Sequence, residues 1–196
     1  MALVESSRNS YSAPAIVLHW AIAALILTNL YLGLRMAGSS GLVKFQIFQL
    51  HKSVGFTILF LSVLRLAWRL IHRAPSYPET MKSWEKRAAS AVHWAFYGVM
   101  IGLPLTGWIV VSASPTNIPT LLFKKIPFPH LGFIHSLPMA TRRALEDSVG
   151  EVHEALAFIT IALVILHVGA ALKHQFWNKD GVLYRMAPFL RIGGAR

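Results

Sequence analysis

Two histidines in the C-terminal half of the sequence, His153 and His167, have a spacing that suits the binding of two metal cofactors. They are 14 residues apart, which on an α-helix is about 1400° of rotation, about 40° short of four turns, and about 21 Å of rise. Both rings would therefore leave one face of one helix at two separate levels. Imidazole is a common axial ligand of haem iron, so the spacing predicts two haem sites.

The other residue types narrow the chemistry. The chain has no cysteine, which excludes disulfides, iron–sulfur clusters, thiolate-ligated or covalently attached haem, zinc ribbons and thiol nucleophiles. Nine histidines remain as the common soft-metal ligands. Two of them, His19 and His51, are candidates for the second ligand at each site, provided that the helices carrying them reach the same depths.

Four long apolar runs must position these histidines. The chain is 55% apolar and 14% charged, with a mean hydropathy of +0.51, whereas soluble domains average about 25% charged residues. About 20 helical residues cross a hydrocarbon layer of about 30 Å. We therefore expect an all-α, integral membrane four-helix bundle. It would be a single membrane domain over residues 1–196, with spans at about 13–36, 52–71, 88–112 and 152–172.

The basic residues predict which way the bundle faces. An even number of spans puts both termini on one side, together with the 73–87 connection, whereas the connections at 37–49 and 113–150 lie on the other. The terminal side carries twelve of the 19 Lys and Arg residues and the opposite side seven, so the positive-inside rule predicts cytoplasmic termini. Membrane loops thus explain the net charge of +11 better than a nucleic-acid partner. The first run is too long for the apolar region of a signal peptide, so we expect a retained anchor.

On this topology the histidines form two sets by depth. His51 and His153 lie near the outer surface, whereas His19 and His167 lie near the inner surface. Because cofactor ligands in a bundle come from facing helices, we expect His51 with His153 and His19 with His167, each pair holding one haem. His93 also lies near the inner surface, and depth does not exclude it. In the alternative interpretations the rings bind backbone carbonyls or water, or form the proton relay of a haem-free transporter.

Short motifs along nearly the whole chain resemble the bacterial cytochrome b561 family. The motifs are Ser12 with His19-Trp20, Leu50-His51-Lys52 with Gly55, Leu103-Pro104 with Gly107, His153-Glu154, Leu166-His167, Phe176-Trp177, and Arg185-Met186 with Pro188. The resemblance implies the same two pairs, His19 with His167 and His51 with His153, and it gives His93 no ligand role. It also implies two haem b groups and a multi-pass protein of the bacterial inner membrane.

The resemblance further implies an oxidoreductase that passes single electrons from superoxide at the outer face to ubiquinone. Iron with two histidine ligands is six-coordinate, which suits outer-sphere electron transfer. An alternative is a haem-b electron-transfer subunit of a hydrogenase- or formate-dehydrogenase-like complex, because those subunits have similar ligands. The length of the chain, close to a minimal four-span unit, argues against that alternative. The expected partners are the lipid bilayer, a quinone, superoxide and a redox partner protein.

Three residues near the inner surface are candidates for the quinone site: Arg69, His174 and Trp177. Arg69 and His174 offer hydrogen-bond donors for a head group, and Trp177 offers a flat apolar wall close to His167 in the chain. The alternative interpretation is that Arg69 extends to lipid phosphate and that Trp177 is an ordinary interfacial anchor.

Basic residues also gather in the 113–150 connection: Lys124, Lys125, Arg142 and Arg143. A cleft lined by positive charge raises the capture rate of an anion, so these residues are candidates for attracting superoxide to the outer haem. His130 and His135 lie in the same connection and receive no role. The alternative is a solvated loop with salt bridges to nearby acidic residues.

Overall fold

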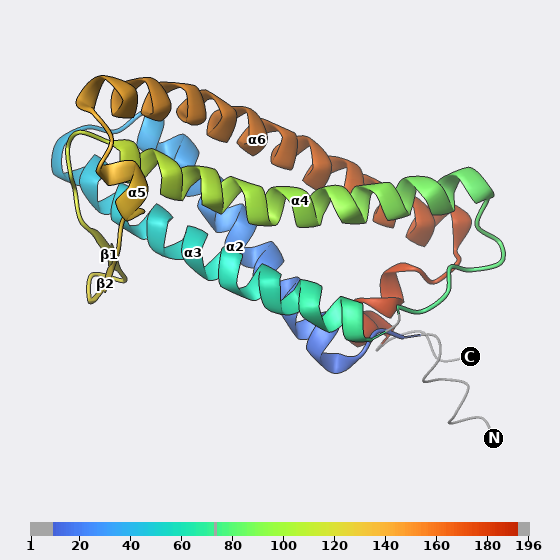
Figure 1. The fold of residues 1–196 in the computed structure, drawn as a ribbon. Helices are drawn as coiled ribbons and strands as arrows, with labels where there is room; N and C mark the ends of the chain where they lie inside the picture. The colour runs from blue at the N-terminus through green and yellow to red at the C-terminus, as the bar shows by residue number, and fades with distance from the viewer. Residues whose placement is uncertain (1–9, 73, 192–196) are drawn as a thin grey trace.

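Four long helices dominate the computed structural model, which describes residues 10–72 and 74–191; Arg8, Arg73 and Arg196 of the charge count lie outside these ranges. The helices are α2 (Ala13–Ala37), α3 (Gly41–Ile71), α4 (Ser83–Ala113) and α6 (Met139–Lys173) (Figure 1). All four are long and apolar enough to cross a membrane. The predicted all-α membrane bundle of four helices is therefore confirmed.

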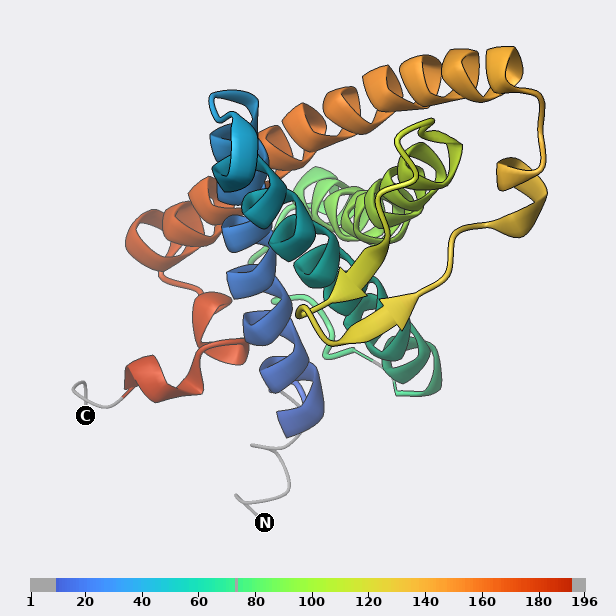
Figure 2. The ribbon, with the colours of Figure 1, turned by 90° about the vertical axis from the view of Figure 1, so that its left-hand side faces the viewer.

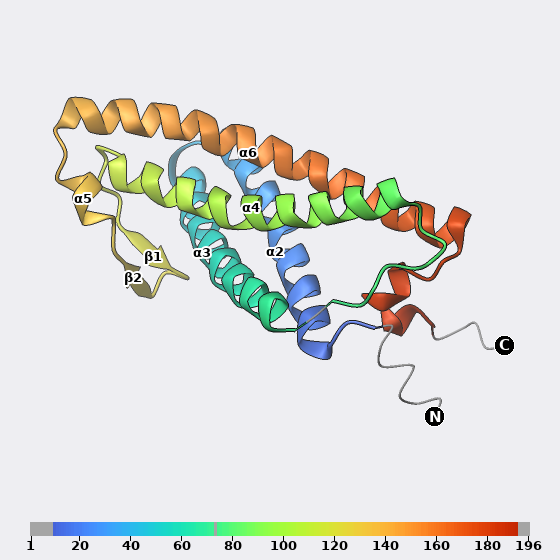
Figure 3. The same cartoon turned by 45° about the vertical axis from the view of Figure 1, so that its right-hand side comes forward.

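The four helices form two joined pairs. α2 packs chiefly against α3 and α4 chiefly against α6, while α3 also contacts α4. Figures 2 and 3 show α6 extending along the bundle and crossing the α2–α3 pair obliquely. The outward faces keep large apolar side chains exposed, among them Phe60, Ile165 and Leu166. Such faces suit a bundle surrounded by lipid, whose helices satisfy their own backbone groups.

The buried core lies mostly between the two levels of histidines, with Leu32 at the level of His51. Its members are Ile22, Ile26 and Leu32 of α2, Val54 and Ile58 of α3, and Tyr97 and Met100 of α4. In α2 this core follows His19, and in α3 it follows His51. Because α2 and α3 run in opposite directions, the core separates a His51 end of the bundle from a His19 end.

Three helices begin before the residues predicted to span the membrane. α3 starts at Gly41, α4 at Ser83 and α6 at Met139, so parts of the expected connections at 37–49, 73–87 and 113–150 are helical. The span rule counts residues apolar enough for hydrocarbon. Polar helix formers such as Arg, Glu and Gln continue a helix beyond that layer, which is why the observed helices are longer.

The rest of the 113–150 connection forms a small cap over the His51 end. β1 (Thr120–Leu122) pairs antiparallel with β2 (Ile126–Phe128), and α5 (Gly132–His135) follows. Side chains of the long helices bond to the cap: Ser53 Oγ accepts from the Phe123 amide at 2.9 Å, and Trp108 Nε1 donates to the Pro129 carbonyl at 3.0 Å. These bonds satisfy backbone groups that lie outside regular structure and fix the cap on the bundle.

The C-terminal segment folds back at the His19 end. It contains the π-helical turn η1 (His174–Asn178) and the 3-10 turns η2 (Leu183–Arg185) and η3 (Pro188–Arg191). Trp20 Nε1 donates to the Met186 carbonyl at 2.8 Å, and the Tyr11 amide donates to the Arg185 carbonyl at 3.4 Å. The first and last described segments therefore lie together, as an even number of spans predicts.

Candidate cofactor sites

One candidate site lies between α3 and α6 at the His51 end. The rings of His51 and His153 have centroids 6.2 Å apart and planes at 71°. Two imidazoles bound on opposite sides of one metal ion, at about 2 Å per metal–nitrogen bond, place their ring centroids roughly 6 Å apart. This pair therefore fits the two axial positions of a haem iron.

Hydrogen bonds at Nδ1 leave Nε2 of both rings available. His51 Nδ1 donates to the Asn29 carbonyl of α2 at 3.2 Å. His153 Nδ1 lies 2.9 Å from Thr106 Oγ1, and that hydroxyl lies 2.7 Å from the Leu103 carbonyl. Because Thr106 gives its one proton to Leu103, it accepts the proton of His153 Nδ1. A metal-binding histidine is commonly oriented by such a bond at its other nitrogen.

Two glycines make room for these rings. A Cβ atom at Gly107 of α4 would lie 3.1 Å from His153 Cε1, and one at Gly33 of α2 would lie 3.5 Å from His51 Cε1. Gly107 belongs to the Leu-Pro-x-x-Gly motif of the sequence, but nothing in that motif marked Thr106 as a partner of His153. The sequence analysis also missed Gly33 and the Asn29 carbonyl, because a contact between α2 and α3 leaves no pattern in the sequence.

The second candidate site lies at the His19 end and brings three histidines together. The centroids of His19 and His167 are 6.1 Å apart, with planes at 64°. His93 of α4 is also next to His167, at 5.9 Å between centroids. Both distances fit one metal ion between two rings, so the geometry by itself does not choose between His19 and His93 as the partner of His167.

Arg65 of α3 adds positive charge beside this second site. It interacts electrostatically with His19, His93 and His167. Its Nη1 donates to the Ala15 carbonyl of α2 at 2.7 Å. A guanidinium has five N–H donors in a planar fork, so donors remain for a carboxylate of a cofactor or for the carbonyl of a quinone.

The three residues expected to bind a quinone lie near the His19 end but do not contact one another. His174 is only 7% exposed, and its Nδ1 lies 2.5 Å from Asp180 Oδ2. Trp177 is 82% exposed, and the Arg69 guanidinium makes a cation–π contact with Trp94, at 5.9 Å from the ring centre. In the described ranges no hydrogen bond, ion pair or ring contact links the three. The spacing of residues within η1 did not reveal that His174 turns inward toward Asp180.

The four basic residues of the 113–150 connection differ in exposure. Lys124 and Lys125 are exposed in the turn between β1 and β2, and Arg143 is exposed on α6. Arg142 is only 5% exposed, which differs from the expected surface position. The reason is that its guanidinium donates to the Ala113 and Ser114 carbonyls and to Asn117 Oδ1, at 3.1, 2.6 and 3.0 Å.

His130 belongs to the cap itself, between β2 and α5. Burial lowers the pKa of His130, and the nearby charges of Lys52, His135 and Arg142 lower it further. His130 is therefore mainly neutral at neutral pH, so it adds little positive charge to this face. The exposed positive charge at this end therefore comes from Lys124, Lys125 and Arg143.

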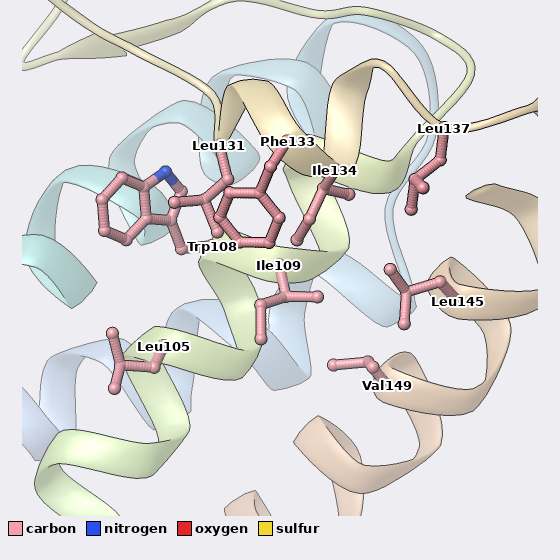
Figure 4. Close-up of a pocket in the computed structure, with 9 residues that line it drawn as sticks. All are labelled: Leu105, Trp108, Ile109, Leu131, Phe133, Ile134, Leu137, Leu145 and Val149. Atoms are coloured by element: carbon pink, nitrogen blue, oxygen red, sulfur yellow. The ribbon is translucent and has the colours of Figure 1, made fainter. Parts of the chain in front are cut away.

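An apolar cavity of about 450 Å³ opens beside the cap, between α4, α5 and α6 (Figure 4). Trp108 and Ile109 of α4, Phe133 of α5, and Leu145 and Val149 of α6 are among the residues that line it. No charged side chain lines this cavity, and none of the candidate ligands does. It is therefore separate from the two histidine sites.

Comparison with known proteins gives a consistent result over nearly the whole chain. The profile of the family described as prokaryotic cytochrome b561 matches residues 10–189. Cytochrome b561 homolog 2 of Escherichia coli is 28% identical over 178 residues, which cover 90% of each chain. Cytochrome b561 homolog 1 of the same organism is 29% identical over 92% of this chain and 98% of its own. A probable superoxide oxidase CybB of Yersinia pestis is 26% identical over 91% and 96%.

Proposed function

The chain belongs to the prokaryotic cytochrome b561 family, a membrane electron-transfer family that binds haem b, and on this premise we propose that it carries two haems and passes single electrons from superoxide to ubiquinone. As a family member with four helices able to span a membrane, it is a multi-pass protein of the bacterial inner membrane. The proposal adds the number of haems, their ligands, the electron donor and the electron acceptor.

The observation that carries the proposal is the pairing of histidines at two levels of α6. His153 pairs with His51 at 6.2 Å and His167 with His19 at 6.1 Å. The 14-residue spacing separates the two levels by about 21 Å. Haem b, when bound, supplies reversible one-electron chemistry. The histidines hold one such group near each face, which suits transfer of electrons across the membrane.

We assign the His51 end to the outer face, where superoxide would arrive. The charge count that predicts cytoplasmic termini supports this assignment. Lys124, Lys125 and Arg143 would attract the anion from solution, while the buried Arg142 holds the cap in place. The name of the Yersinia pestis relative, a probable superoxide oxidase, is a further support. The haem held by His51 and His153 is called the outer haem from here on.

Ubiquinone would accept electrons at the His19 end, beside the inner haem. Arg69, His174 and Trp177 all belong to this end and are the proposed quinone residues. His174 Nδ1 lies 2.5 Å from Asp180 Oδ2 at this end, so a quinone head group here would meet a polar pair of side chains.

The test is haem reduction by superoxide. The purified protein in detergent receives pulses of superoxide, and absorbance reports haem reduction, followed by reoxidation when ubiquinone is added. We expect rapid reduction and quinone-dependent reoxidation, with slower reoxidation in His174→Ala and Trp177→Ala. Negligible reduction of the wild-type haems by superoxide would contradict the proposed donor and favour a relay subunit. Reoxidation unchanged in both variants would contradict the quinone site alone.

A further inference from the structure

The hydroxyl of Thr106 in α4 is in direct contact with one of the proposed haem ligands. Thr106 Oγ1 lies 2.9 Å from His153 Nδ1 and 2.7 Å from the Leu103 carbonyl oxygen. The threonine is partly buried, and a hydrogen bond shielded from water is electrostatically stronger than one on the surface. The ring, the hydroxyl and the carbonyl therefore form a chain of two hydrogen bonds inside the bundle.

Metal binding by His153 would fix the direction of this chain. A neutral imidazole has one N–H group and one nitrogen lone pair. If Nε2 gives its lone pair to iron, the proton is on Nδ1, so His153 donates and Thr106 accepts. The single proton of the hydroxyl then goes to Leu103, whose carbonyl is within reach. Hydrogen bonds in such a chain polarise one another, which makes the hydroxyl a better acceptor for the ring.

The backbone of α4 holds this hydroxyl close to the ring. The next residue is Gly107, where an added Cβ would lie only 3.1 Å from His153 Cε1. The ring is therefore bonded at Nδ1 and enclosed by the helix at Cε1, both from the same turn of α4. These two contacts restrict its rotation, and with it the angle of 71° between the planes of His153 and His51.

The two proposed ligands of the outer haem have different partners at Nδ1. His51 donates to a backbone carbonyl, that of Asn29, at 3.2 Å, so no side-chain substitution removes its acceptor. His153 donates to a side-chain hydroxyl at a shorter distance. Thr106 is thus the position at which one substitution removes a hydrogen bond to a ligand of this haem.

We propose that Thr106 is a positioning residue that fixes the orientation of the His153 ring and lowers the reduction potential of the outer haem. A hydrogen bond accepted from Nδ1 raises the basicity of the ligating nitrogen. A more basic ligand stabilises the oxidised iron, which carries the greater positive charge. The inference rests on the proposed pair of His51 and His153. Its consequence is an outer haem that gives its electron more readily to the inner haem.

The test combines two measurements on the purified full-length protein. A redox titration with chemical mediators, followed by visible absorbance, gives the potentials. Electron paramagnetic resonance of the oxidised haems reports the angle between the two ligand planes through the largest g value. Thr106→Val removes the hydroxyl at nearly the same size, and Thr106→Ser keeps it. Thr57→Val is the matched control, because Thr57 is also partly buried and its hydroxyl donates to a helix carbonyl, that of Ser53, at 2.9 Å.

We expect Thr106→Val to raise the potential of the outer haem and to shift its largest g value. Thr106→Ser and Thr57→Val should leave both quantities at the wild-type value, and the inner haem should be unchanged in all three variants. The same variants in the His167→Ala background isolate the outer haem. If Thr106→Val does not retain this haem, Thr106→Ala, which removes the hydroxyl and leaves the ring more space, is compared with Thr106→Ser instead.

Two results would overturn the inference. One is a variant without the hydroxyl whose titration and resonance spectrum superimpose on those of the wild type at equal haem content, and the other is an equal shift in Thr57→Val. Neither measurement uses superoxide or quinone, so the answer does not depend on the proposed donor and acceptor. A wild-type protein that binds only one haem would contradict the proposed haem sites, which is a separate observation from an unshifted potential.

Discussion

His153 and His167 are the residues whose replacement separates the two proposed haem sites. We expect His153→Ala to lose the outer haem and keep the inner one, and His167→Ala to do the opposite, because each ring serves a different iron. The haem-to-protein ratio, measured by haem extraction, should fall from about two to about one in each variant. Loss of both haems in each single variant, with the protein still folded by circular dichroism, would contradict two independent sites.

His93 needs its own variant because its ring lies 5.9 Å from that of His167, as close as His19 at 6.1 Å. The proposed ligation predicts that His93→Ala keeps both haems and that His19→Ala loses the inner one. The reverse pattern of haem content would make His93 the ligand and leave His19 as its neighbour.

Gly107 tests how closely α4 approaches the outer site. A methyl group there would lie 3.1 Å from His153 Cε1, whereas at Gly98 of the same helix no atom lies within 4 Å of an added Cβ. Forcing such a contact typically costs about 1–3 kcal/mol. We expect Gly107→Ala to lower outer haem occupancy and the melting temperature, and Gly98→Ala to leave haem content unchanged. Equal haem content and equal melting temperature in the two variants would show that the His153 ring can move away from the added methyl group without loss of haem or stability.

At the scale of elements, the cap depends on the first turn of α6. Arg142 holds the segment that follows α4 through two carbonyls and Asn117, while its neighbour Arg143 is exposed. Leaving a buried polar group unpaired costs about 1–3 kcal/mol. Arg142→Met should therefore destabilise the protein and speed hydrogen exchange in residues 113–119. Arg143→Met should change neither by more than experimental error; similar exchange in both variants would contradict the anchoring role.

The turn between β1 and β2 carries the exposed charges that would attract superoxide. Surface attraction is screened over about 8–10 Å at physiological salt, and steering of this kind is worth about 10- to 1,000-fold in rate. We expect the double change of Lys124 and Lys125 to Gln to slow haem reduction by superoxide at low salt, and to have little effect at high salt. Haem content serves as the control. If the rate of haem reduction changes neither with salt nor with the two substitutions, these lysines do not attract superoxide.

The elements show which features the sequence could reveal. Four apolar runs predicted the helices, because hydrocarbon demands about 20 apolar residues in each span. The period of the helix predicted that His153 and His167 share a face, and the structure places a histidine near each. The burial of Arg142 was not predictable, because it depends on hydrogen bonds to a distant part of the chain, including one to the Ser114 carbonyl 28 residues away.

For the whole molecule, the direction of electron flow depends on sidedness. The predicted topology assigns twelve of the 19 basic residues to the side of the termini, so a reporter fused after Arg196 should be cytoplasmic and one inserted near Pro129 should be periplasmic. Enzymatic reporters active in only one compartment make this measurement in intact cells. A C-terminal reporter active in the periplasm would show that the bundle has the opposite orientation. The proposed donor and acceptor faces would then be exchanged.

Because α6 is one continuous helix, the number of residues between His153 and His167 cannot change without moving one ring relative to the other. One residue added between His153 and His167 turns one ring by about 100° relative to the other and moves it by about 1.5 Å, so one of the two facing rings is lost. Insertions and deletions in natural variants should therefore be missing from the 13 positions between the two histidines of α6.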